Sequence, residues 1–183
     1  MDALHFPLPN QLIVVVAAHA ARSPMLDLIA HLALRGPVRV LDAGNQSNIY
    51  PIAQRLRRST LDVNAALQRI QVQRAFTCYQ VAALLDGTPT APVPTLVLDF
   101  LATFYDQDVA LPAALQLLRG CLRQLARLAG PAPLLVSARP PLAACAERAP
   151  LLDLLREAAA QCYEPGEADA GPQMSQLELP DGR

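Results

Sequence analysis

The residues of this sequence that could do chemistry are few, and one type is missing altogether. All fifteen basic residues are Arg, and the chain has no Lys. This excludes Schiff-base chemistry, a Lys general base and the Lys that binds phosphates in a P-loop. Cys78, Cys121, Cys145 and Cys162 stand far apart with no CxxC pair, which excludes a zinc ribbon or a thioredoxin motif. We interpret them as small hydrophobic side chains in a reducing compartment.

Two further groupings invite a catalytic or metal-binding interpretation. Asp27 and His31 are four residues apart on a predicted helix and could share a metal ion with His19, or form a surface ion pair instead. Ser137 lacks the GxSxG elbow of a hydrolase and has no His after it. We therefore predict no metal site and no catalytic residue.

Three carboxylates, Asp99, Asp106 and Asp108, lie in and just after a buried apolar run. Gathered together they could bind a hard cation. The simpler interpretation, which we favour, is one buried Asp followed by a solvated loop.

The elements that would position these residues alternate between strands and helices. Continuous apolar and β-branched runs predict strands at 12–16, 38–41, 70–75, 95–100 and 134–138. Helical spacing predicts helices at 26–34, 49–56, 59–67, 81–85, 111–128 and 148–162, the first with Ser23 as N-cap and Pro24 at its first position. The pattern predicts an α/β fold, with a three-layer, doubly wound, mainly parallel five-stranded sheet and helices on both faces.

Charge divides the 183 residues into two parts. Residues 1–163 carry fourteen Arg against eleven Asp and Glu, a net charge of +3. Residues 164–183 carry one Arg against five acidic residues, a net charge of −4, without apolar periodicity. We predict one α/β domain over 1–163 and a flexible acidic tail over 164–183.

The hydropathy pattern bears on the compartment. The first strong apolar run, Leu12 to Ala18, has seven residues and no basic residue before it. A membrane span needs roughly 18 apolar residues, and a signal peptide needs a basic lead-in. We expect a cytoplasmic protein without a membrane partner.

Ligands of a doubly wound sheet bind beyond the carboxyl ends of its strands. The polar residues that follow the predicted strands there are Asp42, Asn45, Gln80 and Arg139. We expect them to line a crevice at this edge.

A basic stripe lies on the long predicted helix. Arg119, Arg123 and Arg127 repeat at every fourth position, which places them on one helix face. The stripe could contact phosphates or an acidic partner. It could also be an ordinary solvated face that covers apolar neighbours.

Two motifs carry a resemblance to a known family. The segment Arg74-Ala-Phe-Thr-Cys-Tyr-Gln80 resembles the strand-to-helix motif of the RecA-like recombinases, an Arg-Ala-Phe/Tyr stretch that ends in Gln. The segment 96–108 is similar to their Walker B strand, with Asp99, Tyr105 and Asp108 at matching positions. The resemblance covers residues 10–140 and implies the RecA/RadA-like core of the P-loop NTPase superfamily.

The chain departs from this family at the groups that hydrolyse ATP. The stretch Ala17–Pro24 stands where the family has its Walker A loop, and it lacks the Gly, Lys and Ser/Thr pattern. The family's catalytic Glu has no counterpart in 42–45. The resemblance therefore implies a degenerate Walker A, with Arg22, Ser23 and Asp99 as a vestigial nucleotide site. We expect no cofactor and no residual ATP or Mg²⁺ binding.

These departures favour a non-catalytic accessory protein that docks on a partner and assists DNA repair or recombination. The partner would be a RecA-like paralogue, a polymerase or a second copy of the chain, with DNA as a further candidate. A related interpretation is a SulA-like inhibitor of a filament-forming protein. The alternative from another class is a nucleotide- or small-molecule-binding module that uses the crevice near Asp42 and Asp99.

Overall fold

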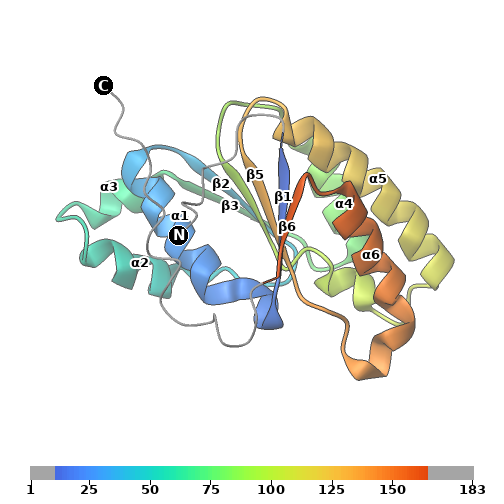
Figure 1. The fold of residues 1–183 in the computed structure, drawn as a ribbon. Helices are drawn as coiled ribbons and strands as arrows, with labels where there is room; N and C mark the ends of the chain where they lie inside the picture. Colours follow the sequence, from blue (N-terminus) through green and yellow to red (C-terminus); the bar gives the residue numbers. More distant parts are fainter. Residues whose placement is uncertain (1–10, 165–183) are drawn as a thin grey trace.

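The computed structural model describes residues 11–164 and shows one parallel sheet between two layers of helices (Figure 1). The strands are β1 (Leu12–Val16), β2 (Val38–Asp42), β3 (Ile70–Arg74), β4 (Thr95–Leu98), β5 (Leu134–Ala138) and β6 (Gln161–Tyr163). The helices are α1 (Arg22–Arg35), α2 (Ile49–Arg57), α3 (Val63–Gln68), α4 (Cys78–Gly87), α5 (Leu111–Ala129) and α6 (Ala149–Ala158). Short 3₁₀ turns are η1 (Ala18–Ala21), η2 (Ala102–Tyr105) and η3 (Ala143–Arg148).

The strand order is β3-β2-β4-β5-β1-β6, and every neighbouring pair is parallel. Parallel neighbours require crossover connections, and helices supply them here. The predicted α/β class, with helices on both faces, is confirmed. The predicted acidic tail beyond Glu164 lies outside the described residues.

The sheet has six strands rather than the predicted five. The sixth strand, β6, consists of three exposed residues that carry no apolar pattern. The helix predicted over 148–162 therefore ends earlier, at Ala158, and β6 begins at Gln161. The strand predicted over 95–100 ends at Leu98, because Asp99 turns out of the sheet with a φ of 46°.

Two apolar clusters hold the layers together. On one face, α4, α5 and α6 pack around Phe100 and Phe104, whose ring centroids are 5.6 Å apart. On the other face, α1 packs against β2, β4 and α2 and buries Met25 and Ile29. Within residues 11–164, no helix combines the length and the apolar character that crossing a membrane requires.

Candidate functional site

The carboxyl edge of the sheet gathers the loops that follow β1, β2, β4 and β5. Parallel strands end at the same edge, so residues more than a hundred positions apart in the sequence meet there. The groups concerned are Arg22, Asp42, Gln46, Asp99 and Arg139.

The loop after β1 is a left-handed turn built without glycine. His19, Ala20 and Ala21 have φ values of 53°, 52° and 49°. The left-handed region costs a residue with a Cβ roughly 1–2 kcal/mol. The loop after β1 is therefore strained.

Relief of this strain is measurable at His19, whose side chain is exposed. We expect His19→Gly to raise the free energy of unfolding by about 0.5–1 kcal/mol, because glycine adopts this φ without strain but loses more chain entropy on folding. Ala18→Gly is the matched control, since Ala18 lies outside the left-handed run, and it should lower stability by a similar amount. Chemical denaturation measures the free energy of unfolding of both variants. If His19→Gly lowered it as much as Ala18→Gly does, the left-handed turn would not be strained.

The start of α1 is already occupied by neighbouring groups. The helix begins at Arg22 after Ala21, so the prediction of Ser23 as N-cap is wrong. Ser23 Oγ instead accepts a hydrogen bond of 2.9 Å from Arg55, and Arg22 donates one of 3.3 Å to the Gln46 carbonyl oxygen. Pro24 has no N–H to offer a ligand. Two of the three predicted nucleotide contacts, Arg22 and Ser23, are thus engaged within the protein.

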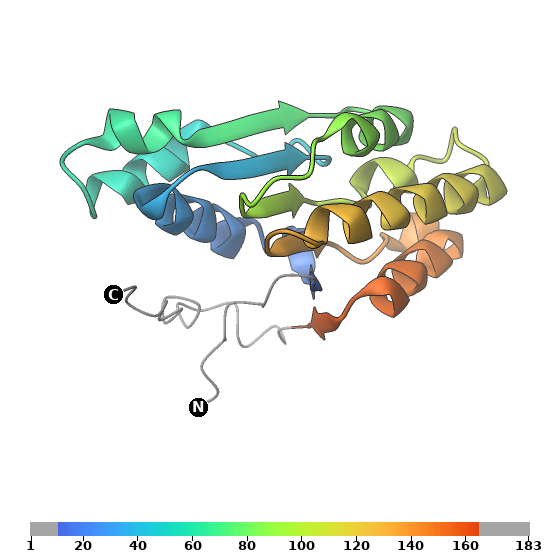
Figure 2. The same ribbon diagram turned by 90° about the horizontal axis from the view of Figure 1, so that it is seen from above.

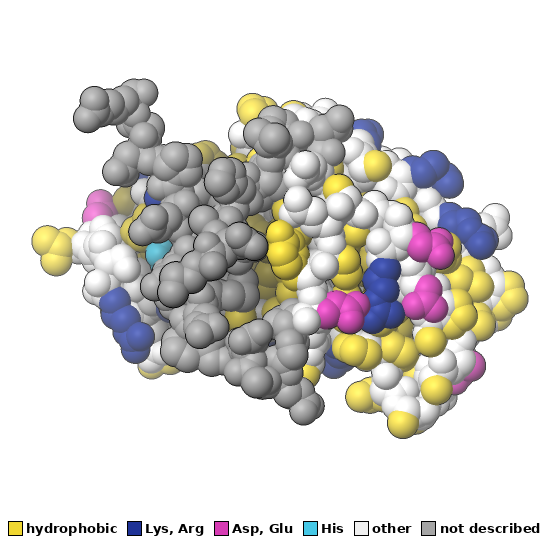
Figure 3. Space-filling view, viewed as in Figure 1, with side chains coloured by type: hydrophobic (Ala, Val, Ile, Leu, Met, Phe, Trp, Pro, Cys, Tyr) yellow, Lys and Arg dark blue, Asp and Glu magenta, His cyan; other side chains and the backbone are white. Residues whose placement is uncertain are grey.

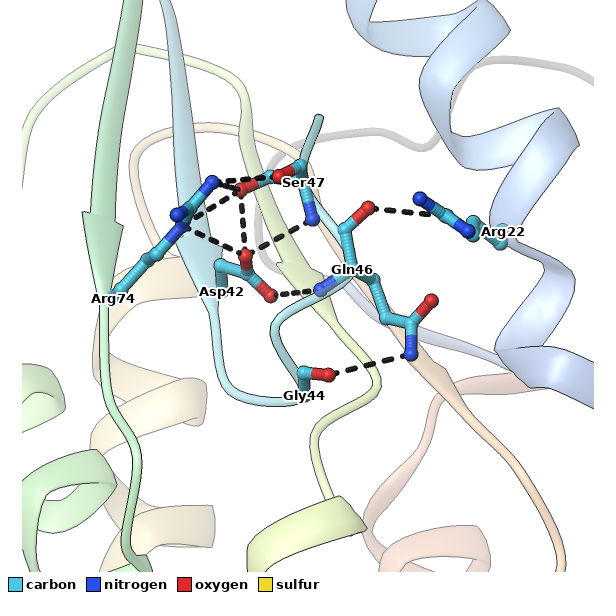
Figure 4. Close-up of polar contacts among 6 residues, drawn as sticks. All are labelled: Arg22, Asp42, Gly44, Gln46, Ser47 and Arg74. Carbon is cyan, nitrogen blue, oxygen red and sulfur yellow. Dashed lines mark hydrogen bonds and ion pairs between the residues drawn. The ribbon is translucent and has the colours of Figure 1, made fainter. Parts of the chain in front are cut away.

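Asp42 is the centre of a closed network (Figure 4). Its carboxylate is fully buried and accepts from Gln46 N at 2.8 Å, Ser47 N at 2.9 Å and Ser47 Oγ at 2.5 Å. Arg74 Nε lies 3.2 Å from the same carboxylate, and this Arg also donates to the Ser47 carbonyl oxygen at 2.6 Å. A carboxylate has about four acceptor positions, so Asp42 has little capacity left for a ligand.

Asp99 is the contrasting case. Its side chain is also fully buried, but Oδ1 has no hydrogen-bond partner among the described residues. Asp99 Oδ2 lies 3.5 Å from Arg139 Nε and accepts a hydrogen bond of 3.4 Å from the side-chain Nε2 of Gln46. Burial raises the pKa of the Asp99 carboxyl, and the Arg139 guanidinium offsets part of that effect. Of the two buried carboxylates at this edge of the described residues, Asp99 is the one with unused acceptor capacity.

Neighbouring residues fix the Asp99 backbone and Arg139. The Asp99 amide donates to Ser137 Oγ at 3.0 Å, and the Tyr105 hydroxyl donates to the Arg139 carbonyl oxygen at 2.9 Å. Burial, with a smaller effect from the Asp99 charge, raises the pKa of the Tyr105 hydroxyl, which keeps it protonated as a donor.

The raised pKa of Asp99 gives stability a pH dependence of known sign. The native state binds this proton more tightly than the unfolded chain does, so stability falls as pH rises from about 4 through the folded-state pKa. We expect Asp99→Asn to remove that fall and to raise the free energy of unfolding at pH 7 on the order of 1–2 kcal/mol. Asp108→Asn, at an exposed position, should change it by less than about 0.5 kcal/mol. Denaturant titrations at several pH values measure the free energy of unfolding of each variant. If its pH dependence were the same in Asp99→Asn as in the wild type, Asp99 would not be the group responsible.

Two of the four predicted crevice residues, Asp42 and Arg139, lie near Asp99. Gln46 contacts both Asp42 and Asp99, and Arg139 Nε is 3.5 Å from Asp99 Oδ2. Asn45 is exposed and takes a φ of 54° in the turn. Gln80 lies in the first turn of α4, where its Oε1 accepts from Phe76 N at 2.8 Å, so within the described residues it serves a helix end. Sequence reasoning missed Gln46, although its place after Gly44 in a strand-end loop was a usable signal.

The predicted basic stripe divides into one engaged and two free residues. Arg127 donates to the carbonyl oxygens of Leu85 and Thr88, both at 2.9 Å, and so closes the end of α4. Arg119 and Arg123 are exposed and make no hydrogen bond or ion pair with another described residue.

Beside them, α4 and α5 enclose a groove of about 630 Å³. Its walls carry small and apolar side chains, with polar groups and one exposed aromatic ring at the rim. They belong to Tyr79, Ala82, Ala83, Asp86, Ala113, Gln116, Leu117, Gly120, Cys121, Arg123 and Gln124.

The remaining candidates have structural explanations. Asp27 pairs with Arg55, and the described residues include no group of three His, Cys, Asp or Glu that could hold a metal ion. Burial raises the pKa of the Cys121 thiol to about 12, and burial also raises the pKa of Cys78. Both thiols therefore remain protonated, which suits core residues rather than nucleophiles.

Comparison of the chain with protein-family models and curated proteins assigns no function to this site. No protein-family model and no curated protein matches the chain, so the resemblance to the RecA-like recombinases stays a prediction from the sequence.

Proposed function

We propose that the chain is a RecA-like core that does not hydrolyse nucleotides and acts as an accessory protein in DNA repair or recombination by docking on a protein partner. The carboxyl edge supports the first half of this proposal. Asp42 is saturated by its own loop and Arg74, and the sequence has no Lys. At the start of α1, Arg22 and Ser23 are engaged by Gln46 and Arg55. Without a free carboxylate pair and a phosphate-binding Lys, phosphoryl transfer lacks its electrostatic support.

The α4–α5 groove is the observation that carries the docking half. Tyr79 at its rim is 59% exposed and Phe76 nearby is 65% exposed, while Arg123 is free to pair with an acidic group. Exposed aromatic and Arg side chains around an apolar groove are typical of protein interfaces. The lining of the groove includes Asp86 as well as Arg123, and Figure 3 shows basic and acidic side chains intermixed on the face of α5 and α6 that it displays. This mixed charge favours a protein partner over DNA.

The test is affinity purification of the tagged full chain from its native host, with and without nuclease. We expect recombination or repair proteins to be recovered in both conditions. The double variant Tyr79→Ala/Arg123→Ala should lose them. Tyr50→Ala/Arg57→Ala is the matched control, because it removes an exposed Tyr and an exposed Arg from α2 on the other side of the sheet, and it should retain them. Recovery only without nuclease, or equal recovery by both variants, would contradict docking through the groove.

A second candidate function is supported by the orphaned Oδ1 of Asp99 beside Arg139. That pair could hold a small molecule or nucleotide at the carboxyl edge. In this case ATP, ADP or another added ligand should raise the melting temperature of the wild type, and Asp99→Asn/Arg139→Ala should abolish the rise. The groove variant would behave like the wild type. Recovery of a filament-forming cell-division protein in the purification would instead favour the SulA-like interpretation.

A further inference from the structure

Strand β3 forms one border of the sheet, and its outer side is open. Figure 2 shows β3 along this border with no other described element beyond it. All but the first of its five residues are exposed. An edge strand presents a row of unpaired backbone N–H and C=O groups, which can serve as a template for a further strand.

The hydrogen bonds between β2 and β3 show which backbone groups of β3 point outward. Val38 N donates to the Arg69 carbonyl oxygen at 3.0 Å, and Ala75 N donates to the Asp42 carbonyl oxygen at 3.0 Å. Residues 69 and 75 therefore face β2, and along a strand the residues that face one neighbour alternate with those that face the other side. Three residues between them direct their N–H and C=O groups to the open side. They are Ile70, Val72 and Arg74.

The strand lacks the features with which proteins usually block an edge. Such features are Lys and Pro residues, β-bulges and covering segments. Residues 70–74 contain neither Lys nor Pro, and their register with β2 runs without a bulge. The one charged side chain, Arg74, is engaged with Asp42 and Ser47. Within the described part of the chain, nothing prevents β3 from pairing with another strand.

We propose that β3 pairs with β3 of a second copy of this chain, antiparallel and about a two-fold axis at Val72. In this register, Val72 faces Val72 of the second copy, Ile70 faces Arg74, and Gln71 faces Gln73. The outward-pointing residues of one copy then face those of the other. Such facing residues exchange both of their backbone hydrogen bonds, so every outward N–H and C=O group gains a partner.

The side chains also fit this register. The two Val72 side chains, each 39% exposed, meet at the axis as a β-branched pair. The amide groups of Gln71 and Gln73 can both donate and accept hydrogen bonds across the pair. Arg74 faces Ile70, so no like charges face each other. A strand that matches its own reversed copy in this way favours a two-fold pair, the commonest symmetry of homo-oligomers, over pairing with an unrelated strand.

Sedimentation equilibrium of the full chain over a range of concentrations tests the pairing. We expect a wild-type dimer that dissociates on dilution, because the strand is short. Val72→Pro should be monomeric, since it removes the outward N–H at the axis, and an edge strand tolerates Pro where the N–H faces solvent. Val72→Thr is the matched control, because it keeps the N–H and the β-branched shape, and it should dimerise like the wild type. Circular dichroism verifies that both variants fold.

Charge pairs test the register. Gln71→Lys/Gln73→Lys places Lys opposite Lys on both sides of the axis and should raise the dissociation constant on the order of tenfold. Gln71→Lys/Gln73→Glu places Lys opposite Glu in the same register and should restore the dimer. Equal weakening by the two double variants overturns the register.

Two results overturn the pairing itself. One is a wild type that stays monomeric up to about 1 mM, and the other is a dimer that persists in Val72→Pro. The proposal does not rest on the α4–α5 groove. The groove variant Tyr79→Ala/Arg123→Ala should therefore remain dimeric, and a dimer lost in that variant but kept in Val72→Pro would place the interface at the groove.

Discussion

Gly44→Ala should destabilise the protein by roughly 3 kcal/mol, because a new methyl group has no room beside Asp99. A Cβ at position 44 would lie 2.4 Å from Asp99 Cβ and 2.7 Å from its Oδ2. Asp99 cannot move aside freely, since its amide is bonded to Ser137 and its side chain is fully buried. The loop after β2 would have to lift, which breaks the hydrogen bonds that Asp42 makes to it.

Gly87→Ala is the matched control for this prediction. A Cβ at Gly87 meets nothing within 4 Å, and the residue ends α4, where alanine is tolerated. Its free energy of unfolding should stay within about 0.5 kcal/mol of the wild type. Urea unfolding followed by circular dichroism measures both variants. Similar small effects in the two would show that the Gly44–Asp99 approach is not tight.

Asp42→Ala should cost about 3–4 kcal/mol, the largest effect of any single polar substitution that we predict. The change removes the acceptor of two backbone N–H groups, at Gln46 and Ser47, and leaves Arg74 without its buried partner. Unpaired buried donors each cost on the order of 1–3 kcal/mol, and loop relaxation recovers part of this.

Two controls separate the network from a simple loss of charge. Asp62→Ala removes another carboxylate that accepts a backbone N–H, at the exposed start of α3, and should cost about 1 kcal/mol. Asp42→Asn keeps the volume but offers one acceptor oxygen, so its cost should lie between those of the two alanine variants. If Asp42→Ala were no worse than Asp62→Ala, the closed network would not be a main source of stability at this edge.

The fold class followed from patterns that act within single segments. The apolar runs around Val14, Val40, Val97 and Val136 predicted buried parallel strands, and each of them is one. The edge strand β6 could not be predicted from the sequence, because Cys162 and its neighbours are exposed and show no apolar pattern. Its pairing with β1 depends on where α6 delivers the chain, which is a tertiary property.

The candidate site was predicted only in outline. Strand ends located Asp42, Asp99 and Arg139, because the carboxyl edge of a parallel sheet follows from strand order alone. The sequence could not distinguish the two carboxylates. Asp42 ends one apolar strand and Asp99 directly follows another. Only the tertiary structure shows that Gln46, Ser47 and Arg74 saturate Asp42, while Asp99 Oδ1 has no partner among the described residues.

By itself, the sequence determined the alternating α/β pattern and the absence of any Lys-dependent chemistry, since residue identity and local periodicity need no partner. The tertiary structure decided what the polar groups do. The contact of Gly44 with Asp99 and the hydrogen bonds of Arg127 to the end of α4 each join loops or helices that are distant in the chain. Such contacts depend on distances between elements, and a one-dimensional pattern does not contain those distances.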